Sequence, residues 1–210
     1  KLNPFSPRKS ERQKMLTWQM WIKVAIASVP AAIVGLLFND YLDAIFYKPV
    51  PVAIMLIVYG VLFIIIEDKH RGKQPKVTRI SQLTLKMLLW IGAFQMLALI
   101  PGTSRSGATI VGALIIGVSR EVAAEFTFFL AIPVMFGASA LKLIKFGFHF
   151  TAAEFGFLML GCVVSFGMSV IAIKFLMNYI KKNDFKVFGY YRIILGALII
   201  LVALFKMLLG

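Results

Sequence analysis

The sequence has 210 residues, of which 60% are hydrophobic and only 15% are charged. A soluble domain could not wet so apolar a surface, so the composition favours an integral membrane protein and excludes an ordinary soluble fold. The 23 Lys and Arg residues outnumber the 9 Asp and Glu residues, and because the phenylalanines lie inside apolar runs, this excess favours an anionic leaflet or substrate over nucleic acid.

Apolar runs, separated by charged residues, proline or glycine, divide the chain into candidate membrane helices. A membrane span needs about twenty residues, so we expect five spans and two shorter arms. The spans are expected at 15–38, 50–66, 126–146, 155–177 and 188–209, and the arms at 83–100 and 108–118. As helices the arms would be about 27 Å and about 16 Å long, short of a hydrocarbon core of about 30 Å.

Basic residues in the polar segments predict the orientation of the chain. Five fall within 1–14, five more between 69 and 79, and Lys181, Lys182 and Lys186 precede the last span. The positive-inside rule places all three segments in the cytoplasm. Region 83–118 must therefore return to the side from which it entered. Since its second arm is too short to cross, we expect a re-entrant hairpin that turns at 101–107 near mid-depth.

The turn of this hairpin carries the most specific motif in the chain, Pro-Gly-Thr-Ser-Arg-Ser-Gly at 101–107. Irregular backbone at that depth must be buried in protein or line a wet cavity, so we expect a polar cavity at the tip. The N-terminus of the outgoing helix would offer unpaired N–H groups, and Arg105 a planar fork of donors that matches phosphate oxygens.

An arginine in mid-bilayer costs about 2.5–3.5 kcal/mol to insert, so Arg105 is a functional candidate. The alternative interpretation is that Arg105 snorkels or pairs with a carboxylate while the neighbouring hydroxyls satisfy backbone groups. Two other phosphate motifs fit poorly. Ala108 stands where a P-loop requires lysine, and Val111 stands where the type-2 phosphatidic acid phosphatases have histidine.

The tip resembles the PGxSRSxxT signature of the undecaprenyl-diphosphate phosphatase family, the bacitracin-resistance membrane enzymes. The matching residues are Pro101, Gly102, Ser104, Arg105, Ser106 and Thr109. Similarity at Val29-Pro30-Ala31, Glu67, Arg120, Glu125-Phe126 and 130–133 extends the resemblance over essentially the whole chain.

The resemblance implies an all-α membrane protein built from inverted repeats, each with a re-entrant hairpin and three spans. The single transmembrane domain 1–210 would then hold the remainder of a first repeat at 15–66 and a second repeat at 81–210. The implied activity is hydrolysis of undecaprenyl diphosphate to undecaprenyl phosphate and inorganic phosphate. This reaction recycles the lipid carrier of cell-wall synthesis and gives bacitracin resistance, at a site open to the outer face of the bacterial plasma membrane.

One signature of that family is missing from this sequence. In the family an acidic ExxxE segment followed by a Ser-Ser-Thr-Gly-His turn lies N-terminal to everything matched here, and residues 1–210 contain no such segment followed by that turn. We therefore expect this chain to carry the phosphate-binding half of the site and to lack the catalytic acids.

The resemblance and the chemistry of the tip assign roles to individual residues. Arg105 would bind and neutralise the diphosphate, and Ser104 is the candidate nucleophile or orienting hydroxyl, with direct attack by water as the alternative. The remaining phosphate-binding candidates are Gly102, Thr103, Ser106, Gly107 and Thr109. Gln95 either points a donor into the cavity from behind these residues or helps the helices to pack.

Metal ligands and histidines add little to the predicted site. No metal-ligand cluster is visible in the sequence, although a divalent cation such as Mg²⁺ or Ca²⁺ is compatible with the family resemblance. His70 lies in a basic loop and His149 near the end of a span, so neither is expected to be catalytic.

A membrane transporter is the rival interpretation of the same features. Carriers also bind anions where broken helices meet at the midplane, so a flippase for a polyprenyl phosphate or another anionic lipid would use the same phosphate grip. Such a flippase would need neither a nucleophile nor a base.

Overall fold

The computed structural model describes residues 10–70, 72–147 and 150–209, and these fold almost entirely into helices. His149 lies outside the described residues, and so do Lys1, Arg8 and Lys9 of the basic segment 1–14. Five of the described helices are long and apolar enough to span a membrane, which confirms the expected class. They are α1 (Glu11–Phe46), α2 (Pro49–His70), α5 (Arg120–Phe146), α6 (Ala152–Lys182) and α7 (Lys186–Leu209).

All five long helices extend beyond the apolar runs from which they were predicted, and α1 and α5 illustrate how. Helix α1 continues to Phe46 rather than ending near residue 38. Helix α5 begins at Arg120 rather than near residue 126, because the Ser119 hydroxyl accepts a hydrogen bond from the backbone N–H of Val122 and caps the helix. The charged first turn of α5 is not apolar, so the apolar run alone underestimates the length of this helix.

The two short arms form a helical hairpin. Its incoming arm is α3 (Leu85–Met96) followed by the 3-10 turn η2 (Leu97–Leu99), and its outgoing arm is α4 (Arg105–Ile115). The arms pack closely where a Cβ atom at Gly112 would lie 2.5 Å from the Phe94 ring, and the Trp90 indole donates a 3.1 Å hydrogen bond to the Gly112 carbonyl. At 12 and 11 residues, neither arm reaches the length of a span.

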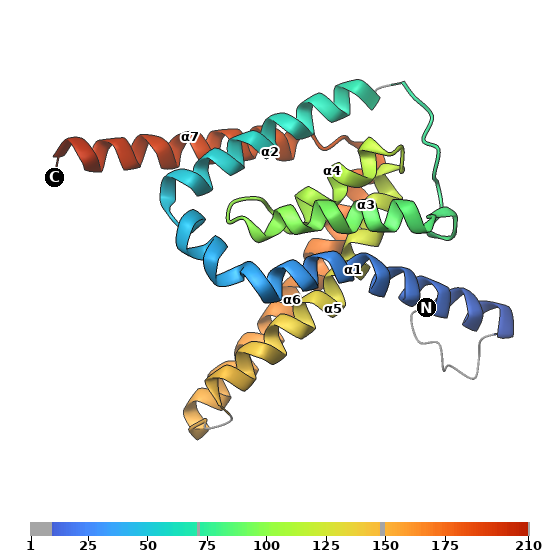
Figure 1. Ribbon diagram of the computed structural model, residues 1–210, viewed down its shortest axis with the longest axis horizontal. Coiled ribbons are helices and arrows are strands. Elements are labelled where there is room, and N and C mark those ends of the chain that lie inside the picture. Colours follow the sequence, from blue (N-terminus) through green and yellow to red (C-terminus); the bar gives the residue numbers. More distant parts are fainter. Residues whose placement is uncertain (1–9, 71, 148–149, 210) are drawn as a thin grey trace.

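Both ends of this hairpin lie at the same end of the molecule. The Lys76 N–H donates to the Gly117 carbonyl at 2.8 Å, and the Ser119 N–H donates to the Val77 carbonyl at 2.8 Å, so the chain leaves the hairpin beside the point where it entered. Figure 1 shows α3 and α4 running side by side between α1 and the α2–α7 pair. The depth of the hairpin in a membrane and the inverted repeat remain predictions.

Helices α2 and α7 pack against each other along most of α2 (Figure 1). The two helices approach closely because glycines lie at their contact. A Cβ atom at Gly60 would lie 2.7 Å from the Gly189 carbonyl oxygen, and one at Gly196 would lie 2.7 Å from the Ala53 carbonyl oxygen. Small residues at a helix crossing let two backbones approach, as is common between membrane helices. The end of α5 and the start of α6 extend away from the other helices (Figure 1), whereas the start of α5 packs against α4 and α1.

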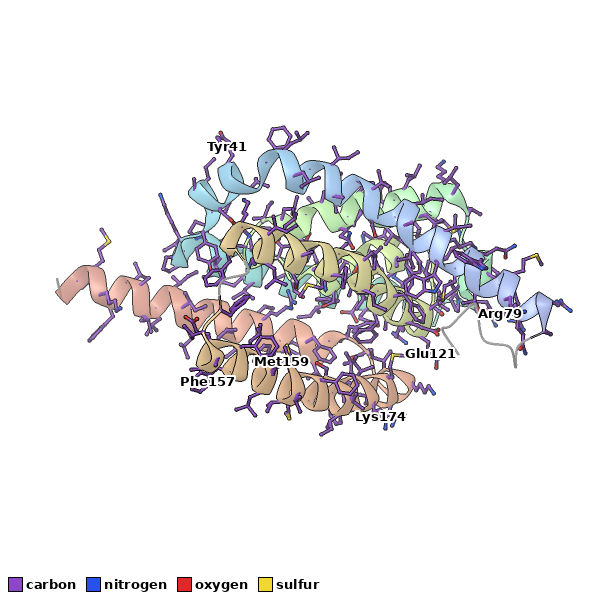
Figure 2. The ribbon with its side chains drawn as sticks, turned by 90° about the horizontal axis from the view of Figure 1, so that it is seen from below. Tyr41, Arg79, Glu121, Phe157, Met159 and Lys174 are labelled. Carbon is purple, nitrogen blue, oxygen red and sulfur yellow. The ribbon has the colours of Figure 1, made fainter. Side chains whose placement is uncertain are left out.

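Charged residues join the ends of three helices, α2, α5 and α7. The buried carboxylate of Glu67 on α2 forms an ion pair with Arg120 at the start of α5 and accepts a 3.2 Å hydrogen bond from the Phe185 N–H just before α7. Next to it, Asp68 pairs with Lys186 at the start of α7. In Figure 2, Arg79, Glu121 and Lys174 lie toward one end of the molecule, and Tyr41 and Phe157 lie toward the other. The basic segments after α2 and before α7 therefore share one end, as their charges predict.

Candidate active site

The turn between η2 and α4 is built around Gly102. This residue has φ +92°, a conformation that side-chain-bearing residues rarely adopt, and a Cβ atom there would collide with the Val52 carbonyl oxygen in the first turn of α2. The Thr103 N–H closes the turn by donating to the Ile100 carbonyl at 3.1 Å. Glycine is thus required both by the backbone angle and by the contact with α2, and the tip of the hairpin is held against that helix.

The hydroxyl of Ser104 caps α4. Its Oγ accepts a 3.2 Å hydrogen bond from the Gly107 N–H and lies 3.1 Å from the Oγ of Ser106. Two hydroxyls therefore meet at the N-terminus of α4, where the first N–H groups of a helix lack intrahelical partners and the helix dipole is positive. This is an arrangement that favours an anion.

Two arginines come to the same helix turn. Arg105 is the first residue of α4, and Arg192 reaches it from α7, since a Cβ atom at Gly107 would lie 3.2 Å from Arg192 Nη2. The Arg192 guanidinium also lies over the Phe63 ring, 5.5 Å from its centroid. In each arginine Nη1 is buried and has no hydrogen-bond partner within the described part of the chain. Arg105 Nη1 therefore has no carboxylate partner among the described residues, and the role of Arg105 in phosphate binding remains a prediction.

The sequence analysis missed Arg192. It lies inside the last apolar run, and the argument that made Arg105 a functional candidate applies to it equally: an arginine within a membrane span is costly and needs a reason. Without the structure, nothing indicated that α7 would bring this side chain to the hairpin tip.

Two more buried polar side chains near the hairpin turn lack partners. Thr103, in the turn itself, is 1% exposed, and Gln95, on the last turn of α3, is 2% exposed. The Thr103 hydroxyl and both polar atoms of the Gln95 amide have no hydrogen-bond partner among the described residues. Buried polar groups are normally hydrogen-bonded, so these donors and acceptors suit a polar ligand or a further protein segment.

Thr109 is placed differently from the other candidates. Its hydroxyl hydrogen-bonds to the carbonyls of Arg105 and Ser106 at 3.0 and 3.1 Å and lies 2.9 Å from the Thr127 hydroxyl on α5. The side chain thus joins the first turn of α4 to α5. Its expected direct contact with phosphate remains a prediction.

The described part of the chain shows no cluster of metal-ligating side chains. No three His, Cys, Asp or Glu side chains gather in a way that could hold a metal ion, as far as the described residues extend. The free Cys162 is exposed on α6. No step proposed below passes through a metal.

Taken together, the fold and this site define an integral membrane protein that presents a capped helix N-terminus and two guanidinium groups inside a helical bundle. Residues 3–198 match the family described as bacitracin resistance protein BacA. A protein of Desulfitobacterium hafniense named undecaprenyl-diphosphatase is 59% identical over 202 residues, which is 96% of this chain and 73% of that protein.

Relatives of the same name in other bacteria agree with this match. One in Enterococcus faecalis is 60% identical over 95% of this chain and 74% of its own length, and one in Lactococcus lactis is 55% identical over 100% of this chain and 75% of its own length. The chain belongs to the bacitracin resistance protein BacA family.

Proposed function

We propose that this protein is a hydrolase that converts undecaprenyl diphosphate to undecaprenyl phosphate and inorganic phosphate. This activity recycles the lipid carrier of cell-wall synthesis and gives bacitracin resistance. Membership of the family and the names of the relatives support the proposal. The structural observation that carries it is the pair of buried Nη1 atoms, from Arg105 and Arg192, which have no partner among the described residues at the first turn of α4.

The residues around this turn have complementary roles in the proposed reaction. The two guanidinium groups neutralise the diphosphate, and the N–H groups of α4 with the hydroxyls of Thr103, Ser104 and Ser106 hold its oxygens as charge builds up. The bond between the terminal phosphorus and the bridging oxygen breaks, and the undecaprenyl phosphate leaves with that oxygen. A new P–O bond forms to the attacking oxygen.

The attacking oxygen belongs either to water or to Ser104. The Ser104 Oγ already accepts a hydrogen bond from the Gly107 N–H, so its own proton is free to point toward Ser106 or a base. A serine nucleophile needs a base within hydrogen-bond reach and would give a phosphoserine that water then hydrolyses. Attack by water leaves Ser104 as an orienting hydroxyl.

The proposed setting is the bacterial plasma membrane, with the basic segments in the cytoplasm and the site open to the outer face. The basic segments share one end of the molecule, and the hairpin starts from that end. The excess of Lys and Arg there is the pattern of a cytoplasmic end.

Release of inorganic phosphate from undecaprenyl diphosphate by the purified full-length protein in detergent tests the proposal. We expect release by the wild type and a strong loss in Arg105→Lys, because a point charge cannot reproduce the two-pronged grip of a guanidinium. Ser104→Ala separates the two nucleophiles, since water attack would leave much of the activity. Movement of the lipid across vesicles without phosphate release would instead favour a flippase and overturn the proposal.

A further inference from the structure

A cavity of about 590 Å³ lies at the end of the molecule where the hairpin begins and ends, and the proposed reaction makes no use of it. Its walls come from the end of α2, the segment 73–78, the C-terminal end of α4 with residues 116–119, the start of α5 and the end of α6. The candidate active site lies at the other end of α4, so the two sites share one helix of 11 residues.

The rim of this cavity is basic. Lys73, Lys76, Arg120 and Lys181 line it, with Glu67 and Glu121 as the acidic residues. Glu67 is already paired with Arg120. Three lysines therefore face one remaining carboxylate, that of Glu121, and the surplus positive charge suits an anion.

The cavity also has an apolar part to its lining. This apolar wall consists of Leu114, Ile115, Ile116, Val118 and Ile180. An inorganic anion would gain nothing from this wall, whereas an amphiphile would place its charge at the lysines and its hydrocarbon against the isoleucines. The cavity is also at the polar end of the helices, where headgroups of the surrounding bilayer lie.

We propose that this cavity binds the headgroup of an anionic phospholipid, with the lysines on the phosphate and the upper acyl chain on the apolar wall. Bound lipid would touch the C-terminal end of α4 and the segment that is hydrogen-bonded to it, because the Lys76 N–H donates to the Gly117 carbonyl. The lipid therefore supports the hairpin from the end opposite its tip. This inference does not depend on the proposed reaction.

Lipid binding to the purified full-length protein in detergent tests the proposal, using dioleoyl phosphatidylglycerol, dioleoyl phosphatidylcholine and inorganic phosphate as probes. Each basic residue near an anionic headgroup adds roughly fivefold to affinity, so Lys73→Gln/Lys76→Gln/Lys181→Gln should weaken phosphatidylglycerol binding on the order of 100-fold. The matched control, Lys142→Gln/Lys145→Gln/Lys174→Gln, removes the same charge from exposed positions on α5 and α6 that do not line the cavity.

A variant expected to bind more tightly keeps the proposal testable even if the triple variant does not fold. Glu121→Lys should bind phosphatidylglycerol more tightly by a factor of more than about five, since it removes a repulsion and adds an attraction. Equal binding by the triple variant and its control would overturn the proposal, as would unchanged binding by Glu121→Lys. Binding of phosphatidylcholine as tight as that of phosphatidylglycerol, or occupation of the cavity by inorganic phosphate at the same concentration, would also overturn it.

Discussion

Arg192 on α7 lies against Gly107 on α4, where a Cβ atom would be 3.2 Å from Nη2 and 3.4 Å from Nη1 of the guanidinium. This contact joins the hairpin to a helix that is about 85 residues further along the chain. The position of Arg192 in turn depends on how α7 packs against α2.

Gly107→Ala should lower activity without lowering stability. Alanine favours a helix over glycine by about 1 kcal/mol, so the thermal unfolding midpoint should not fall. The added methyl group would push the Arg192 guanidinium away by a few tenths of an ångström, and we expect kcat/KM for phosphate release to drop on the order of tenfold. Gly137→Ala on α5 is the matched control, since a Cβ atom there meets nothing within 4 Å. Full activity in Gly107→Ala would argue against the role of this contact.

Gly60→Ala should destabilise the protein by separating α2 from α7. A Cβ atom at Gly60 would lie 2.7 Å from the Gly189 carbonyl oxygen, which cannot move without moving the α7 backbone. Overpacking of this kind costs about 1–3 kcal/mol, and the midpoint of thermal unfolding in detergent measures it. Gly161→Ala on α6, where a Cβ atom has no neighbour within 4 Å, should not lower the midpoint. Equal midpoints for the two variants would show that α2 and α7 are not in close contact.

Glu67→Gln should destabilise the protein more than the neighbouring Asp68→Asn. The Glu67 side chain is 1% exposed and bonds both Arg120 and the Phe185 N–H, so its replacement weakens two buried hydrogen bonds at a cost of about 1–3 kcal/mol, while the 39% exposed Arg120 stays partly hydrated. Asp68 is half exposed in its pair with Lys186, and surface pairs of this type contribute little. Chemical denaturation of the two variants in parallel checks the difference, and a larger loss in Asp68→Asn would contradict the structure.

Thr109→Val separates a structural role of this hydroxyl from direct contact with phosphate. If the Thr109 hydroxyl acts through Thr127, then Thr127→Val should have a similar effect on stability, about 1 kcal/mol, and the double variant should cost less than the sum. A rise in KM for Thr109→Val that Thr127→Val does not share would show instead that Thr109 touches the substrate. Denaturation and steady-state kinetics on the same three variants give both readouts.

The sequence predicted those parts of the structure that local patterns determine. Apolar runs of about twenty residues predicted the five long helices, and the Pro-Gly pair at 101–102 predicted the turn that Gly102 makes at φ +92°. The start of α5 was predicted six residues too late, because the capping by Ser119 and the charged turn after it carry no hydropathy signal.

Contacts between distant segments could not be predicted in the same way. The apolar run around Arg192 correctly indicates a helix, but its meeting with Gly107 depends on the α2–α7 packing at Gly60 and Gly189. Local pattern does not encode that pairing. The ion pair of Glu67 with Arg120 is an intermediate case, since Glu67 lies near the end of α2 and Arg120 begins α5, both at polar boundaries where opposite charges can meet.

A double-mutant cycle between Arg105 and Arg192 tests the central claim, that two arginines hold one diphosphate. Phosphate release from undecaprenyl diphosphate is measured for the wild type, Arg105→Gln, Arg192→Gln and the double variant. Each single change should lower kcat/KM on the order of 100-fold, and the double variant should lose less than the product of the two losses, by a coupling of about 1 kcal/mol. Wild-type kcat/KM in Arg192→Gln, or losses that multiply without coupling, would contradict the account.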